Sequence, residues 1–164
     1  MATCIPEAIM VVIETRLNTI TVANGFENTI SEVVRPTRMG DFQPQDLQII
    51  LTSGDIVPVP ANHCPGNPPA NAWKMPVRIA GILRASETST VAKDKTKLQF
   101  MADAIKALGD SASNSWHTFG QNALNSEIVS IEDYQADDGS GSGFMINLEV
   151  LFRTDETNLF NVHA

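Results

Sequence analysis

The chain has 164 residues, which is the size of one domain rather than two, and we expect residues 1–164 to form a single domain. Hydrophobic residues make up 43% of it and charged residues 18%, so it can bury a core and falls outside the disordered class. No apolar stretch reaches the roughly 18–20 residues needed to cross a bilayer, and the acidic start MATCIPEAIMVVIE is unlike a secretory signal peptide. We therefore expect synthesis in the cytoplasm and no membrane partner.

The net charge of -8 is concentrated in the last third of the chain. Residues 1–106 hold as many basic as acidic side chains, whereas residues 107–164 hold Arg153 as their one base. An anionic surface repels phosphates, which argues against DNA as a tightly bound ligand. A cationic stretch from Lys74 to Lys106 and an anionic end favour head-to-tail contacts between identical subunits, although a solvated mixed surface explains the same charges.

The first element is predicted by apolar residues at helical spacing: Ile9, Ile13, Leu17 and Ile20. Pro6 is tolerated in the first turn of this helix, and Gly25 is placed to end it. Two strands follow, one over residues 29–35 that Pro36 ends and one in the alternating residues 47–51.

Prolines then interrupt residues 58–71, which predicts a loop at an edge or rim because proline has no N–H to donate. Alternation over residues 73–85 predicts a long strand, with Pro76 placing part of it at a sheet edge and Gly81 suggesting a bulge. A second amphipathic helix starts near Thr90 and stops at Gly109. Its predicted apolar face contains Leu98, Met101, Ile105 and Leu108, and its outer face contains Lys93, Lys95, Lys97 and Lys106.

The end of the chain predicts a β-hairpin. A strand over residues 127–134 leads through a flexible, glycine-rich tip at 135–143 into five alternating apolar residues: Phe144, Ile146, Leu148, Val150 and Phe152. These should face the core, which leaves Leu151 as the odd apolar residue on the outward side. Residues 154–164 form an extended tail. The predicted fold is α+β, with a small mixed or antiparallel sheet packed by two main helices and a protruding C-terminal hairpin.

Residues that could carry chemistry are few. Gly109, Asp110 and Ser111 form a GDS sequence, but the glycine-rich context of a serine nucleophile is missing. Cys4 and Cys64 are too few for a disulfide scaffold and lack zinc-type spacing. The acids at 133–138 match neither an EF-hand nor a calcium β-roll. We expect no enzyme, no cofactor and no metal, and a small soluble hydrolase that uses His117 with Asp110 or Ser111 is a remote alternative.

Three segments carry a resemblance to a known family: ITVANGFENTISEVVRP, WKMPVRIAGIL, and the ending SWHTFGQNALNSEIVSIEDYQADDGSGSGFMINLEVLFRTDETNLFN. They resemble the tail terminator, or tail completion, proteins of long-tailed bacteriophages, in which a final hairpin leads to a strand ending in aromatic-x-Thr, as in Phe152-Arg153-Thr154. The resemblance implies a homohexameric ring in the virion that caps the head-proximal end of the tail tube and stops its polymerisation. Its partners would be the tail tube protein and a head-completion protein, and DNA would pass through its channel without specific binding.

On this interpretation, the interface or channel residues are Asp137, Asp138, Gly139, Gly141, Gly143, Leu151, Arg153, Leu159 and Phe160. Glu132 and Asp133 would join the anionic channel lining, which repels DNA. The glycines would make the tip mobile until it docks on the tube. Leu159 and Phe160 would either pack back or insert into the adjoining subunit, and insertion is the favoured alternative. A head-completion or connector protein of the neck is the second interpretation.

Overall fold

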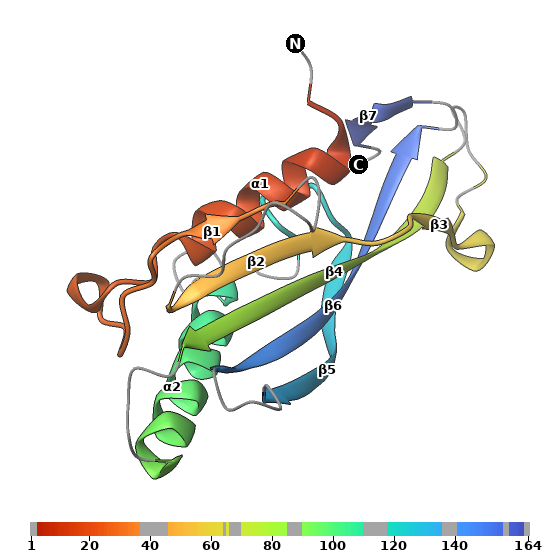
Figure 1. Ribbon diagram of the computed structural model, residues 1–164. Helices are drawn as coiled ribbons and strands as arrows, with labels where there is room; N and C mark the ends of the chain where they lie inside the picture. The colour runs from red at the N-terminus through yellow and green to blue at the C-terminus, as the bar shows by residue number, and fades with distance from the viewer. Residues whose placement is uncertain are drawn as a thin grey trace.

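The computed structural model describes residues 3–36, 46–63, 65, 70–84, 90–109, 118–135, 141–155 and 158–162 (Figure 1). Its helices are α1 (Ile5–Leu17) and α2 (Thr90–Leu108), with short 3-10 helices η1 (Val22–Asn24) and η3 (Pro60–Asn62). Its strands are β1 (Val33–Val34), β2 (Gln48–Ser53), β3 (Val57–Pro58), β4 (Ala70–Arg84), β5 (Asn125–Gln135), β6 (Gly141–Asp155) and β7 (Asn158–Val162). Two helices and a mixed sheet confirm the predicted α+β fold.

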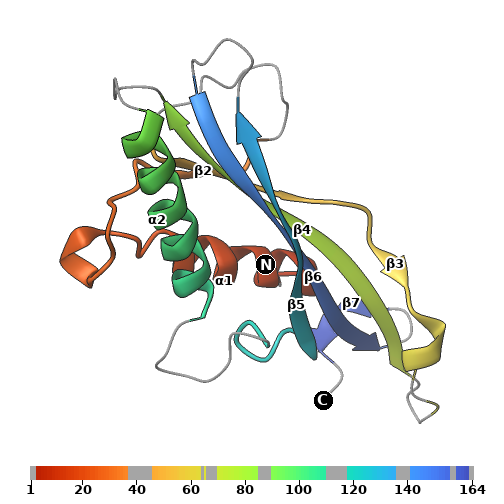
Figure 2. The ribbon, with the colours of Figure 1, turned by 90° about the horizontal axis from the view of Figure 1, so that it is seen from below.

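The described strands form one sheet in the order β1-β2-β4-β6-β5, with β3 beside β4 and β7 beside β6. The β1–β2 pair is parallel and the other pairs are antiparallel. β4 and β6 pair along their whole length, from Ala70 opposite Asp155 to Arg84 opposite Gly141. Figure 2 shows that α1 and α2 both lie on the same side of this sheet.

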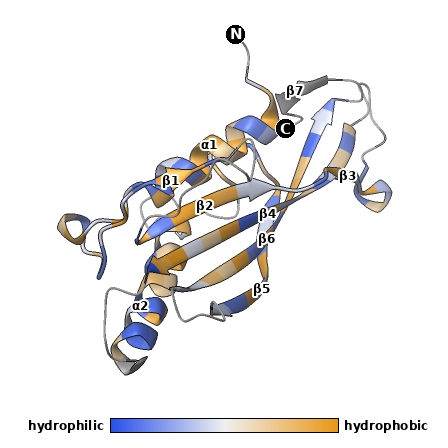
Figure 3. Cartoon of the chain, viewed as in Figure 1, coloured by the Kyte–Doolittle hydropathy of each residue, from blue (hydrophilic) through white to orange (hydrophobic). Residues whose placement is uncertain are grey.

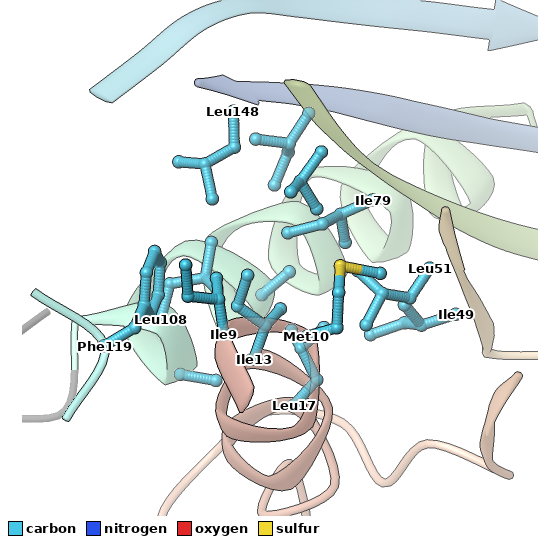
Figure 4. Packing of buried hydrophobic residues seen from close by; sticks show 14 of the residues in the cluster. Ile9, Met10, Ile13, Leu17, Ile49, Leu51, Ile79, Leu108, Phe119 and Leu148 are labelled. Carbon is cyan, nitrogen blue, oxygen red and sulfur yellow. The ribbon is translucent and has the colours of Figure 1, made fainter. Parts of the chain in front are cut away.

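The core lies between that side of the sheet and the two helices. All five alternating residues of β6 are buried there, as the sequence predicts. Hydropathy changes from residue to residue along β4 in the same way (Figure 3). In Figure 4, Met10 and Ile13 extend from α1 toward Ile79 of β4. α2 contributes Phe100, whose ring meets Phe144 of β6 edge-on, with centroids 5.2 Å apart.

α1 starts at Ile5 with Pro6 in its first turn, as predicted, but it ends at Leu17. The prediction that Gly25 ends this helix is wrong. Gly25 instead ends η1, where its φ of 81° is a left-handed conformation that glycine adopts without strain.

α2 has its predicted ends, and three of the four predicted apolar residues face the core: Leu108 is buried, and Met101 and Ile105 pack against the core while partly buried. The prediction is wrong for Leu98. Leu98 is 49% exposed, and the most buried positions are Phe100, Asp103, Ala104, Ala107 and Leu108. Asp103, a charged residue, also points inward. Its carboxylate accepts the backbone N–H groups of Glu27 (3.2 Å) and Asn28 (2.9 Å).

One prediction for the long central strand holds locally and the other is wrong. β4 lies between β2 and β6, but the β2 pairing ends opposite Val77 and the β3 pairing begins at Lys74. Among the described strands Pro76 therefore has no partner on that side, which is a local edge where its missing N–H is tolerated. The predicted bulge at Gly81 is wrong. Gly81 stays in register, and a Cβ there would overlap the ring of Phe144. The irregularity lies instead in β5, between Ile128 and Ser130.

Other expected boundaries change as well. The strand expected over 29–35 reduces to β1, and the proline segment 58–71 includes Pro58 of β3, η3 and the start of β4. Residues 118–120 form a turn. The C-terminal segment is not a free extension, because β6 continues to Asp155 and β7 folds back beside β6 and α1 (Figure 1).

Candidate interaction surface

The side of the sheet turned away from the helices carries alternate residues of five strands, and we call it the open face. Strand registers place on it Val34; Ile50 and Thr52; Lys74, Pro76, Arg78, Ala80 and Ile82; Met145, Asn147, Glu149 and Leu151; and Asn125, Glu127, Ser130, Glu132 and Tyr134. Neither of the described helices α1 and α2 covers this side (Figure 2). It is therefore the largest sheet surface that the described part of the chain offers to a partner.

An apolar row crosses the open face. Val34, Ile50, Ala80 and Met145 are direct neighbours in successive strands β1, β2, β4 and β6. Each of the four is partly exposed. Directly opposite residues have Cβ atoms only about 4.5–5.5 Å apart, so the row is one continuous strip. Tyr134, 62% exposed, stands near its β5 end. Contiguous exposed apolar surface of this kind is typical of interaction sites.

Beyond this row, the open face carries acids on β5 and β6. Glu127 lies directly opposite Glu149 in the β5–β6 pair. Lys74 neutralises Glu149 through an ion pair of 2.8 Å across β4 and β6. Glu127 is exposed, and its side chain has no hydrogen bond or ion pair with the described residues. Like charges directly opposite one another destabilise a sheet, and the ion pair with Lys74 offsets this for Glu149, whereas Glu127 itself is left without an opposite charge among the described residues.

A base without a partner lies in the middle of the same face. Arg78 of β4 is exposed between Thr52 and Asn147, and within the described part of the chain its guanidinium makes no ion pair. Asn147 is already engaged, because its amide donates to Ser130 (2.9 Å) and to Glu132 (2.6 Å). Arg78 is thus an exposed cation and Glu127 an exposed anion for which the described residues supply no ion pair, and the same holds for Arg84 and Glu132 on this face.

Two of the predicted site residues, Leu151 and Arg153, lie on this side of β6. Arg153 donates from Nε to the carbonyl of Asn62 at 3.3 Å, which holds η3 against the end of the sheet. Gly141 and Gly143 belong to β6 rather than to a hairpin tip, and a Cβ at Gly143 would overlap the carbonyl of Gly81. The close β4–β6 approach requires Gly143.

The remaining predicted positions are placed differently or fall outside the described ranges. Asp137, Asp138 and Gly139 fall in residues 136–140, outside the described ranges. Leu159 and Phe160 have their backbone in β7, which pairs with β6 of the same chain. This pairing favours the packing-back alternative for the backbone of the tail, and their side chains lie outside the description.

Asp133 does not belong to an anionic lining on the open face. It lies on the helix side of β5, where its carboxylate accepts from Lys97 of α2 at 2.8 Å. This hydrogen bond holds the pKa of Lys97 above its ordinary value against the opposing effect of burial, and Asp94 acts in the same direction as Asp133. The pair ties α2 to β5.

A groove of about 690 Å³ lies near the C-terminal ends of α1 and α2, and it contains two cations. Arg16 donates to the carbonyl of Leu108 at 2.8 Å, and Lys106 donates to the carbonyl of Gly25 at 2.7 Å. Lys106 also lies 4.8 Å from the centre of the Phe26 ring. Both cations thus donate hydrogen bonds to carbonyl groups near helix ends, where positive charge is favourable. Their role in the groove is therefore to stabilise the fold.

The remote hydrolase hypothesis stays a prediction, because its residues Asp110, Ser111 and His117 lie outside the described ranges. Nε2 of His63 is buried without a hydrogen-bond partner in the described part, and its neighbour Cys64 is also outside the description.

Among the described residues, no three histidine, cysteine or acidic side chains are grouped for a metal ion. None of the described helices is both long and apolar enough to cross a membrane. No protein-family model and no curated protein matches the sequence.

Sequence reasoning finds Leu151 and Arg153 on the open face but misses Arg78, Glu127 and the apolar row. The missed residues come from strands far apart in the chain and become neighbours only through the strand registers. The available signal is the alternation in β4, which places Arg78 and Ala80 opposite to the buried Val77 and Ile79.

Proposed function

We propose that this protein is a structural component of a bacteriophage virion, the tail terminator. Six copies form a ring at the head-proximal end of the tail tube, which stops tube polymerisation and joins the tail to a head-completion protein. DNA passes through the ring without specific binding. The protein acts by assembly and not as an enzyme.

The observation that carries this proposal is the open face, which combines a partly exposed apolar row with uncompensated charges of both signs. A ring subunit needs surfaces that fit its own copies, and a heterologous contact between such surfaces closes into a ring when its rotation permits. The resemblance of three long sequence segments to tail terminators supplies the particular assembly. The acidic C-terminal third supports a channel that does not retain DNA.

Negative-stain imaging of the purified protein mixed with uncapped tail tubes tests the proposal. We expect additional density at one end of each tube and shorter tubes when the protein is present during polymerisation. The matched variant replaces residues 136–140 by a single Asn, so that Asn and Gly141 form a two-residue turn between the paired residues Gln135 and Ser142 and the β5–β6 register is kept. This variant should fold normally and show less end density if the hairpin tip docks on the tube.

Tubes that keep bare ends and an unchanged length would contradict the tail-terminator function. If the protein then binds purified portals or heads in a parallel imaging experiment, it belongs to the head side of the neck, as a head-completion or connector protein.

A further inference from the structure

We propose that the open face is where one copy of this chain docks on the next, with Arg78 of one copy against Glu127 of its neighbour. The inference rests on the proposed function for the ring geometry, because self-assembly is what brings identical copies together. Beyond the proposed function, it identifies the docking surface, a second copy of the chain as the partner, and the ion pair that sets how the two copies align.

Glu127 supplies the first argument. Its cross-strand neighbour is Glu149, which already pairs with Lys74 at 2.8 Å. That ion pair offsets the charge of Glu149, but Glu127 has no ion pair of its own with the described residues. A cation from outside the chain would compensate Glu127, and Arg78 of a second copy is such a cation.

Arg78 supplies the second argument. It lies on β4, two strands away from β5, with β2 on one side and β6 on the other, so it occupies the middle of the sheet. Any partner that covers the open face must cover its guanidinium. Covering a cation without an acid to pair it is strongly unfavourable, so the partner must bring a carboxylate to this position.

A second copy of the chain fits both requirements. Glu127 is at the accessible edge strand β5, from which it can reach a neighbouring molecule, while Arg78 is at the centre of the face that such a neighbour would cover. The apolar row adjoins Arg78 through Ala80, so the same contact buries Ile50 and Met145 from water. The apolar strip supplies attraction, and the charge pair fixes how the copies align.

Charge exchange tests this pairing. Arg78→Glu and Glu127→Lys should each weaken self-association of the full chain by about tenfold or more, measured by sedimentation velocity over a concentration series. The double variant with both changes should associate like the wild type. Mixing the two single variants should also restore association. In an alternating assembly of the two, one contact holds the native pair and the next holds the charge-reversed pair, so every contact joins opposite charges.

The two single variants also separate local pairing from net charge. The chain carries a net charge of -8, so Glu127→Lys makes copies repel one another less overall. If net charge governed association, this variant would associate more strongly than the wild type. Lys95→Glu and Glu27→Lys repeat the two charge changes at exposed positions off the open face, so they report the effect of net charge alone and should each change association much less than the matching open-face variant.

Three results would overturn the inference: a wild type that stays monomeric at all concentrations, single variants that associate normally, or a double variant that fails to recover. If the protein gives tube-end density but its association does not respond to the charge changes at Arg78 and Glu127, the proposed docking surface is wrong and the tail-terminator function is retained. If association depends on these two charges but no tube-end density appears, the docking surface is retained and the tail-terminator function is wrong.

Discussion

Asp103 organises the contact between α2 and the segment after η1. It is 3% exposed, and its carboxylate accepts two backbone N–H groups, from Glu27 and Asn28, as well as the Asn28 side-chain amide at 2.8 Å. A buried carboxylate is tolerated when hydrogen bonds replace its lost water, as these three do. Because the donors sit on a loop, Asp103 holds that loop to the helix.

We expect Asp103→Ala to lower the free energy of unfolding by about 2–3 kcal/mol, because hydrogen bonds to a charged group are lost and two backbone donors are left unpaired. Asp103→Asn should lose less, since its amide oxygen still accepts. Urea denaturation measures both. Asp55→Ala, at an exposed loop position, is the control and should change stability little. Equal stability of Asp103→Ala and the control would show that the loop is held by other contacts.

At the scale of elements, Arg35 links the segment after β1 to α1. Its guanidinium donates to both carboxylate oxygens of Glu7, at 2.8 and 2.6 Å, and reaches Glu14 at 3.5 Å. The hydrogen bond from Arg35 holds the pKa of Glu7 below its ordinary value, and the same bond raises the pKa of Arg35. Glu7 is partly exposed, so solvent weakens the pair.

The pH dependence of this pair has a definite sign. The folded-state pKa of Glu7 lies below the unfolded value of about 4.3, so its contribution is complete above that pH and is lost as the pH falls through the folded pKa. Glu7→Gln should therefore cost about 0.5–1 kcal/mol at pH 7 and nothing in strong acid. Denaturation curves across this range measure the difference. Glu27→Gln, whose side chain is exposed, should show no such pH-dependent gap.

The elements also show which parts of the fold the sequence can predict. β6 follows strict alternation because one of its faces is buried in the core along most of the strand while the other is partly exposed, and that local pattern is sufficient. The orientation of α2 is not predictable in this way. Leu98 is 49% exposed, whereas Asp103 is 3% exposed and accepts a hydrogen bond from Asn28, 75 residues away in the chain, a contact that no local pattern reveals.

At the scale of the whole molecule, the candidate surface depends on sheet order. Arg78 and Glu127 lie on β4 and β5, and the strand between them, β6, comes last of the three in the chain. No local periodicity reveals that these two residues share a face. The prediction of Leu151 as an outward apolar residue follows from β6 alone, whereas the apolar row needs the registers of β1, β2, β4 and β6 together.

The charge of the whole chain opposes the local pairing that we propose. Copies with a net charge of -8 repel one another at long range, whereas Arg78 and Glu127 would attract across a short contact. Salt separates the two effects, because the screening length falls from about 30 Å at 0.01 M to about 8 Å at 0.15 M and about 3 Å at 1 M. Moderate salt therefore removes the long-range repulsion before it weakens the contact.

We accordingly expect wild-type self-association to pass through a maximum at intermediate salt. Arg78→Glu should behave differently, because it replaces the attraction by a repulsion that salt only relieves, so its association should rise steadily with salt concentration. Sedimentation velocity across a sodium chloride series measures both curves. The double variant with Arg78→Glu and Glu127→Lys should recover the maximum. Parallel curves for the wild type and Arg78→Glu would mean that net charge and apolar contact govern assembly, without a specific ion pair between copies.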